Sequence, residues 1–333
     1  MYPRVAIDAM GGDNAPGAPV SGAVMAAKAL GSSVCLVGDE ERMREALGRM
    51  GGYPKELVTV RHAPGVIDAG EQPVGALRRK KDSSMVVALN MLKQGEADVL
   101  VSAGNTGALL AGGVMTVGRL KGVDRPAISA VLPSRKGGGV LLVDAGANVD
   151  ARPEHLVQFA IMGSVYAGRV LGWNPVSVGL LNVGAEEGKG CETVKQAYSR
   201  LKGRSEFVGN IEARDVLDGD VNVVVCDGFV GNVFLKTVEG TAGMIFHSLK
   251  AELADGALSK VGGLLLKPAF RRLKKRLDYS EYGGAPLLGL SKPVIKCHGS
   301  SGPAAIMNGC RVGVEFARSG AINAVLQEIR TPD

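Results

Sequence analysis

The chain has 333 residues, of which 46% are hydrophobic, only 4% are aromatic and 48 are glycine, and its formal net charge is +6. This length suffices to bury a core in one large or two medium domains, and the hydrophobic fraction excludes a disordered chain. The positive charge favours acidic partners. No apolar run approaches the ~20 residues of a membrane span, and the first residues are typical of a strand, not of a signal peptide.

Short apolar strands alternate with helical patterns along most of the chain. Strands are predicted at 5–7, 34–37 and 58–61, and helices at 17–30, 40–50 and 109–120. A hairpin or meander is expected over 127–143, followed by a helix at 153–171 and a βαβ run over 176–225. Such alternation predicts a largely parallel sheet with right-handed crossovers.

Five predicted strands end in Asp, Asn or Ser beside glycine. The five segments are VAIDAMGGDNAP (5–16), VLVSAGNTG (99–107), LLVDAGANVD (141–150), GLLNVGAEEGKG (179–190) and VVVCDGFVGN (223–232). Glycine lets a ligand come close, and a strand that leads into a helix exposes N–H groups that suit an anion. Ligands of open parallel sheets sit outside the carboxyl ends of the strands, so we expect these five ends to converge on one cleft. The candidate residues in them are Asp8, Gly11, Gly12, Asn105, Thr106, Asp144, Asn148, Asp227 and Asn232.

Two lysines are candidates for binding phosphate. The segment GAEEGKG (184–190) is one residue short of a P-loop, and Gly190 stands where Ser or Thr would hold magnesium, which argues against ATP hydrolysis. Lys189 is therefore either a solvated loop residue or a point charge for phosphate. The basic run 78–81 is either a solvated face or, with the following serines capping a helix, places Lys81 next to phosphate.

Other recognised chemistries lack their motifs in this chain. The five cysteines are scattered without a C-x-x-C pair, which predicts reduced thiols in a cytosolic protein and no metal site. Neither a G-x-G-x-x-G nor a G-x-S-x-G motif occurs, so a dinucleotide fingerprint and a hydrolase nucleophile are absent. Among the histidines, His298 stands out because it opens HGSSGP, a predicted helix start that adds Gly299 and Ser300 to the anion-binding candidates.

Residues 254–290 are predicted to form an amphipathic helical arm with interruptions at Gly262-Gly263 and Pro268. Three interpretations stay open: a buried helix pair, a dimer arm, and a helix lying on an anionic membrane. The basic content disfavours burial, and an acidic protein partner suits the same patch. The residues proposed for membrane or partner contact are Leu264, Leu265, Leu266, Arg271, Arg272, Lys274 and Lys275.

Seven collinear motifs together resemble the bacterial acyl-acyl-carrier-protein:phosphate acyltransferase family, PlsX. They are IDAMGGD (7–13), KKDSSM (80–85), SAGNTGAL (102–109), DAGAN (144–148), LLNVGAEEGKG (180–190), CDGFVGNVFLK (226–236) and YGGAPLLG (282–289). The resemblance implies a three-layer α/β/α fold similar to that of the isocitrate and isopropylmalate dehydrogenases. It further implies one acyltransferase domain of two lobes over residues 1–333, a protruding helical arm and a homodimer.

The resemblance also implies an activity and its partners. A long-chain fatty acyl group would move from acyl carrier protein to inorganic phosphate, and the acyl phosphate would feed phospholipid synthesis, without cofactor or metal. The expected location is the cytoplasm, peripherally on the inner face of the cell membrane. A downstream glycerol-3-phosphate acyltransferase is a further candidate partner, and nucleic acid is not expected.

The residues suit that chemistry. Phosphate is anionic near neutral pH and a thiol leaves at a pKa of ~8.5, so the reaction needs positioning and oxyanion donors, not a covalent nucleophile. We expect Lys189 to neutralise phosphate or the oxyanion, Asn232 to donate to the carbonyl oxygen, and Asp227 to orient them. Three rival functions remain: a short-chain acyl-coenzyme A phosphate acyltransferase, a nicotinamide-dependent dehydrogenase of the same fold, and a non-catalytic membrane scaffold for lipid-synthesis enzymes.

Overall fold

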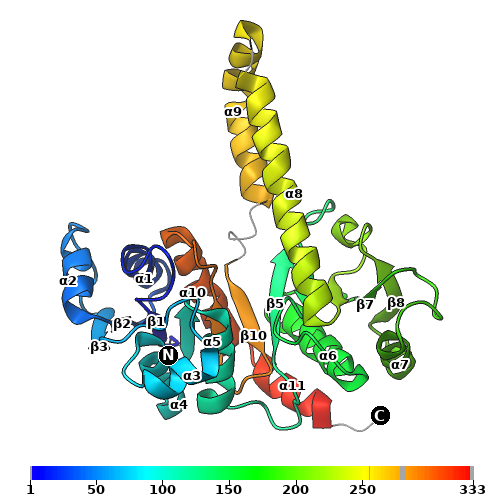
Figure 1. Ribbon diagram of the computed structural model, residues 1–333, viewed down its shortest axis with the longest axis horizontal. Helices are drawn as coiled ribbons and strands as arrows, with labels where there is room; N and C mark the ends of the chain where they lie inside the picture. The colour runs from blue at the N-terminus through cyan, green and yellow to red at the C-terminus, as the bar shows by residue number, and fades with distance from the viewer. Residues whose placement is uncertain (1, 255, 278–282, 331–333) are drawn as a thin grey trace.

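The computed structural model describes residues 2–254, 256–277 and 283–330. In this part of the chain, one eleven-stranded sheet with the order β3-β2-β1-β4-β11-β10-β5-β6-β9-β7-β8 runs through the whole body (Figure 1). The strands are β1 (Val5–Asp8), β2 (Val34–Gly38), β3 (Val58–His62), β4 (Val99–Ser102), β5 (Ala127–Leu132), β6 (Val140–Val143), β7 (Val178–Asn182), β8 (Phe207–Glu212), β9 (Val223–Val225), β10 (Ala285–Leu288) and β11 (Val294–Lys296).

Helices cover both faces of this sheet. The helices of the described part of the chain are α1 (Gly17–Leu30), α2 (Glu40–Gly48), α3 (Pro73–Arg79), α4 (Ser84–Gln94), α5 (Thr106–Gly112), α6 (Pro153–Arg169), α7 (Glu192–Leu201), α8 (Gly228–Ala254), α9 (Ala257–Leu277), α10 (Pro303–Arg318) and α11 (Ala321–Arg330). We call the part around β1 to β4 the first lobe and the part around β6 to β9 the second lobe.

The strands are apolar throughout because both faces of the sheet are buried. In β4, Val99 and Val101 pack into one core with α1, α6 and α10, whereas Leu100 packs into a second core with α3, α4 and α5. Alternate side chains of a strand point to opposite faces, so one short run of valine and leucine serves both cores. The three-layer α/β fold expected from the family resemblance is thereby confirmed.

Strand direction reverses between the two lobes. Strands β3, β2, β1, β4 and β11 are mutually parallel, but β10 is antiparallel to both β11 and β5, and β6 is antiparallel to β5. Strands β6, β9, β7 and β8 are again parallel to one another. The predicted mostly parallel sheet is confirmed.

The reversal bears on the expectation that the five polar strand ends converge on one cleft. Because β6, β7 and β9 run opposite to β1 and β4, their carboxyl ends point in the opposite direction along the strands. The five polar strand ends therefore do not lie on one side of the sheet, yet Thr106, Ala145 and Asn232, from three of the five segments, line one groove. They divide into two groups, one in each lobe.

Helix α8 begins in direct contact with the turn that follows β6. A Cβ atom at Gly228 would lie 2.7 Å from the Asn148 backbone nitrogen, and one at Gly231 would overlap the carbonyl oxygen of Asp144. The Gly228 N–H donates to the Asn148 carbonyl at 2.7 Å. Asp227 caps the helix by accepting a hydrogen bond from the Val230 N–H at 2.9 Å. These contacts fix where the following residues of α8 lie.

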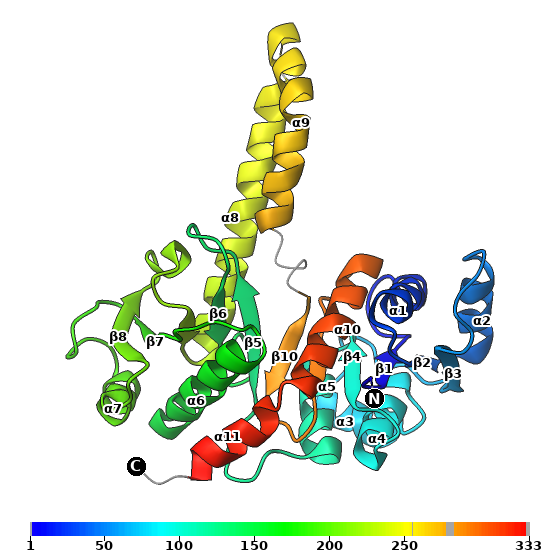
Figure 2. The same cartoon turned by 180° about the vertical axis from the view of Figure 1, so that it is seen from behind.

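Helices α8 and α9 project from the body as an antiparallel pair (Figures 1 and 2). This corrects the bounds of the predicted arm, 254–290: the arm includes most of α8, and residues 285–288 form β10 inside the sheet. The expected interruptions at Gly262-Gly263 and Pro268 are also wrong, because α9 is one continuous helix. Its packing along α8 holds it helical in spite of the proline. Residues 255 and 278–282 of the predicted range lie outside the described residues.

Two glycines of α8 provide a matched test of this packing. Gly231→Ala should lower the free energy of unfolding by about 3 kcal/mol or more, because the new methyl group overlaps the Asp144 carbonyl. Gly243→Ala, where nothing lies within 4 Å, should raise it by about 0.5–1 kcal/mol through helix propensity. Urea denaturation measures both, and equal effects would contradict the packing described.

Candidate active site

A groove crosses the centre of the sheet, where the end of β11 faces the first turns of α8. We call it the central groove, and its volume is about 260 Å³. Its lining comes from both lobes and consists of Thr106, Ile128, Ala130, Val131, Ala145, Asn232, Leu235, Lys236, Glu239, Gly284, Ala285, Lys296, Cys297, His298, Gly299, Ser301 and Ala305.

A second cavity of about 540 Å³, the first-lobe pocket, adjoins the central groove and shares Thr106, Lys296 and Gly299 with it. The rest of its lining comes from the turns after β1 and β4 and from the loop before α3, namely Met10, Gly12, Asp13, Val66, Ile67, Asp68, Ala69, Ala103, Gly104, Asn105 and Gly107. The central groove therefore connects the first-lobe strand ends with α8.

Asn232 is the predicted site residue best placed to bind a ligand. It lies in the second turn of α8, where it lines the central groove and is exposed. Gly146, at a φ of 140°, faces it, and a Cβ there would stand 3.5 Å from the Asn232 side chain. Among the described residues nothing hydrogen-bonds the Asn232 amide, which leaves its N–H groups available to a carbonyl oxygen.

Asp8 has a structural position in the first lobe. It is only 2% exposed and accepts hydrogen bonds from the hydroxyls of Ser84 at 2.6 Å and Ser102 at 2.7 Å. These contacts tie β1 to β4 and to the start of α4. Burial raises the pKa of the Asp8 carboxyl, and the serine hydroxyls oppose that rise. Gly11 packs against the same carboxylate, since a Cβ there would lie 2.6 Å from it.

Asp144 has the equivalent position in the second lobe. Its carboxylate is fully buried and accepts hydrogen bonds from the N–H groups of Ile128, Gly146, Ala147 and Asn148 at 2.7–3.1 Å. The Asn148 side chain donates to it as well, at 2.8 Å. Burial raises the pKa of Asp144, against the effect of these donors. Asp144 and Asn148 thus shape the turn and do not line the cavities.

Asn105 holds the outer wall of the first-lobe pocket. Its Oδ1 caps α5 by accepting from the Ala108 N–H at 2.9 Å, while its Nδ2 lies 2.9–3.2 Å from the carbonyl oxygens of Asp68, Ala69 and Glu71. Thr106 follows it and lines both cavities.

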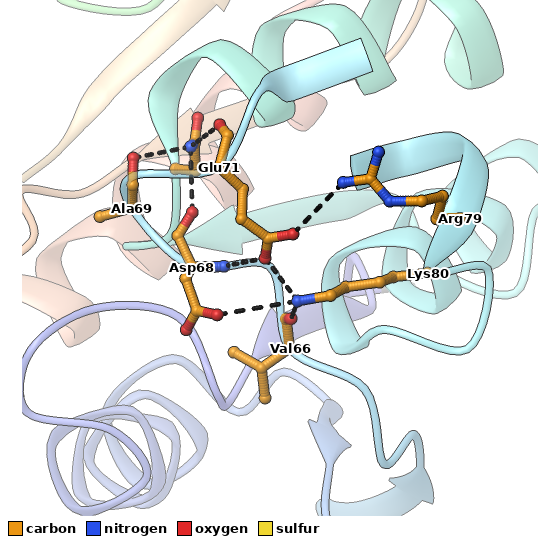
Figure 3. A network of polar contacts seen from close by, with 7 residues as sticks. Val66, Asp68, Ala69, Glu71, Arg79 and Lys80 are labelled. Atoms are coloured by element: carbon orange, nitrogen blue, oxygen red, sulfur yellow. Dashed lines mark hydrogen bonds and ion pairs between the residues drawn. The ribbon is translucent and has the colours of Figure 1, made fainter. Parts of the chain in front are cut away.

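Neither Lys81, predicted to bind phosphate, nor its neighbour Lys80 lines the two cavities. Lys81 is exposed and lines neither cavity. Its neighbour Lys80 instead donates to the carbonyl of Val66 at 2.7 Å and pairs with Glu71, with Asp68 3.7 Å away (Figure 3). The ion pair with Lys80 lowers the pKa of Glu71 and raises that of Lys80. Lys80 therefore ties down the loop 66–71 and is not free to meet phosphate.

The turn after β11 packs against the turn after β1. The Asp13 N–H donates to the Gly299 carbonyl at 2.8 Å, and the Asn14 side chain donates to the Ser300 carbonyl at 3.0 Å. A Cβ at Gly12, whose φ is 95°, would lie 2.9 Å from that Gly299 oxygen. His298 Nδ1 lies 2.8 Å from the Ser300 hydroxyl. His298 and Gly299 line the central groove, whereas Ser300 does not.

Lys189 lies on the other side of α8. A third cavity, the α8 pocket of about 560 Å³, includes Asn182, Gly190, Cys191, Asp227 and Val233 in its lining. The carbonyl of Lys189 accepts from the Asn182 side chain at 3.0 Å, and the Lys189 side chain is exposed. The structure therefore places Lys189 and Asp227 by the α8 pocket and Asn232 in the central groove, and it does not bring Lys189 and Asn232 into one cavity.

Lys296 is a candidate that the sequence reasoning missed. It ends β11 and lines both the central groove and the first-lobe pocket. Burial lowers the pKa of its ammonium, although the carboxylates of Asp8 and Asp13 act in the opposite direction. The signal was present, because Lys296 closes an apolar strand just before HGSSGP, in the manner of the other polar strand ends.

The central groove offers donors but no activated nucleophile. Asn232, Thr106 and Lys296 can all donate hydrogen bonds into it. Cys297 also lines it, but burial raises the pKa of this thiol to about 12, so it stays protonated at neutral pH. Among the described residues, no group of three or more His, Cys, Asp or Glu side chains could hold a metal ion.

Comparison with known proteins bears on this chemistry. The model of a family described as "Fatty acid synthesis protein" matches residues 3–324. A phosphate acyltransferase from Pelotomaculum thermopropionicum is 51% identical over 331 residues, covering 98% of this chain and 94% of its own length. Another, from Bacillus cereus, is 51% identical over 324 residues and covers 97% of each chain.

Solved structures show the same fold at low identity. A phosphotransacetylase from Streptococcus pyogenes has a TM-score of 0.62 at 16% identity, over 95% of this chain and 94% of that one. A 4-hydroxythreonine-4-phosphate dehydrogenase from Klebsiella pneumoniae has a TM-score of 0.54 at 12% identity, over 96% and 100%. The expected three-layer α/β fold is thereby shared with a phosphotransacetylase and with a dehydrogenase.

Proposed function

Since the chain belongs to the phosphate acyltransferase family, we propose that it transfers a long-chain fatty acyl group from acyl carrier protein to inorganic phosphate. The product would be an acyl phosphate, which carries an activated acyl group into phospholipid synthesis. The observation that supports direct transfer is the lining of the central groove, where donors are present and the Cys297 thiol is held protonated.

The acceptor and the donor make different demands on this site. Phosphate needs a cation and N–H or O–H donors, which the junction of the central groove and the first-lobe pocket provides. The thioester carbonyl needs a donor placed where negative charge develops, and the Asn232 amide suits that role. In this proposal Asp8, Asp144, Asn105 and Asn148 position the turns and do not touch the substrates.

A long acyl chain needs an apolar surface, and α8 provides one. A cavity of about 770 Å³ runs along this helix, and its lining includes Phe234, Val238, Ile245, Phe246 and Leu249. A short acyl group would leave such a surface unused. This favours the long-chain donor over the short-chain acyl-coenzyme A alternative, and the net charge of +6 favours an acidic carrier protein.

The reaction is tested with palmitoyl-acyl carrier protein, with and without inorganic phosphate, by following free carrier-protein thiol and acyl phosphate. We expect release that depends on phosphate, with equal amounts of acyl phosphate. Release only from a short acyl-coenzyme A would instead support the short-chain enzyme. No release from either donor would contradict the proposal and favour the dehydrogenase or the scaffold.

The roles of Lys189 and Asn232 are tested together, because they flank different cavities. We expect Lys189→Ala and Asn232→Ala each to lower kcat by about 10²-fold or more, with unchanged melting temperatures, through loss of charge and of oxyanion donation. Lys195→Ala, an exposed lysine of the nearby α7, should retain wild-type turnover. Near-normal turnover of Lys189→Ala would remove Lys189 from the mechanism and leave the central groove as the reaction centre.

We also propose that the arm attaches the protein peripherally to the inner face of the cytoplasmic membrane, and that the protein is a homodimer. The side chains of Leu264, Leu265 and Leu266 are 68%, 76% and 49% exposed, and Arg272 on the same helix is exposed too. Apolar and basic groups together suit an anionic interface. No described helix is long and apolar enough to cross a membrane. The side chains of Arg271, Lys274 and Lys275 lie outside the described part.

Replacing Leu264, Leu265 and Leu266 together with serine should abolish sedimentation with liposomes that contain anionic lipid, because the interfacial apolar surface is lost. Val208→Ser, at an exposed position on β8, serves as the control and should sediment like the wild type. If the triple variant still sediments but elutes as a monomer in gel filtration, the arm belongs to the dimer contact.

A further inference from the structure

Lys296 lies at the junction of two cavities that the preceding proposal uses. It is the last residue of β11, between β4 and β10, and it lines both the central groove and the first-lobe pocket. Among the described residues that line the first-lobe pocket, it is the only lysine or arginine. The other lysine of the central groove, Lys236, is already paired with Glu239 at 2.7 Å.

The ammonium group of Lys296 is held by main-chain oxygens and not by a carboxylate. Its Nζ donates to the Ala103 carbonyl at 3.2 Å and to the Cys297 carbonyl. No described carboxylate lies within ion-pair distance. An ammonium carries three hydrogens, so two are used and one remains for a ligand.

This arrangement leaves a half-buried positive charge with no described carboxylate within ion-pair distance. Partial burial lowers the pKa of Lys296 against the opposing effect of Asp8 and Asp13, and an anion bound beside the ammonium would favour its charged form. The two carbonyl contacts come from the turns after β4 and after β11, so they fix the ammonium where both turns meet the cavities.

We propose that Lys296 binds the acceptor phosphate at this junction, with the Thr106 hydroxyl as a neighbouring donor. Phosphate then lies in the first-lobe pocket, and the acyl thioester approaches along the central groove from the side of Asn232. The carboxylate of Asp13, which also lines the first-lobe pocket, can accept a hydrogen bond from a protonated phosphate oxygen. The inference rests on the proposed acyl transfer for the identity of the anion.

Lys296→Gln removes the charge while keeping a polar side chain. We expect it to raise the KM for phosphate at least tenfold, to leave the KM for acyl carrier protein within twofold, and to abolish phosphate binding in calorimetry without any donor. Lys296→Arg, which keeps the charge, should retain more phosphate affinity than the glutamine variant. Lys292→Gln, just before β11, makes the same charge change outside both cavities and should bind phosphate like the wild type.

A purely structural Lys296 would behave differently. The glutamine variant would then lose kcat and thermal stability while its phosphate KM and calorimetric affinity stayed as in the wild type, and that result would overturn the proposal. Lys296→Met, which fills the volume of the stem without charge, replaces the glutamine variant if that one does not fold.

A crystal of the wild-type protein grown with phosphate needs no variant. Phosphate oxygen within about 3 Å of Nζ supports the proposal, whereas phosphate bound only elsewhere refutes it. Calorimetry with phosphate alone also separates this inference from the proposed function. Phosphate binding that depends on Lys296, without acyl transfer, would contradict only the proposed reaction. Acyl transfer that is unchanged when Lys296 is replaced would contradict only this inference.

Discussion

The geometry of the central groove depends on the contact between α8 and the turn after β6. The Asp144 carboxylate gathers N–H groups from β5 and from its own turn, and the Asp144 carbonyl oxygen touches α8 where residue 231 has no side chain. Because the buried carboxylate fixes the turn and the glycine allows the contact, the position of Asn232 relative to the sheet is set within narrow limits. A larger residue at position 231 would move the whole helix.

In the first lobe a buried carboxylate likewise fixes the turns, but it accepts hydrogen bonds from different groups. Asp8 draws Ser84 and Ser102 together, and the turns that follow β1, β4 and β11 then pack on one another through Gly12 and Gly299. In both lobes a buried carboxylate holds strand ends and turns in place, while other side chains line the cavities. This division explains why Asp8 and Asp144 do not line the cavities, whereas Thr106, Asn232 and Lys296 do.

The sequence allowed the fold class to be predicted well, because alternating apolar strands and helices of this length have few arrangements. It could not establish that β6, β7 and β9 run opposite to β1 and β4, since strand direction depends on pairing with β10, which lies far away in the chain. Asn232 could be predicted because polar residues at strand ends and the family resemblance pointed to the same segment. The expectation that polar residues at strand ends bind the ligand could not distinguish Asp8 and Asp144 from residues that line the cavities. Burial of their carboxylate oxygens depends on N–H and O–H donors that lie far away in the chain. Lys296 was missed because lysine at the end of a short strand is common at protein surfaces.

Helix α8 is at once a wall of the central groove and the root of the arm. Its last residue, Ala254, stands roughly 30 Å along the helix axis from Asn232, at 1.5 Å per residue. A continuous helix resists bending, so it acts as a rigid strut between the catalytic body and whatever the far end of the arm contacts. That length would hold the body about 30 Å away from any surface or partner that binds the far end of the arm.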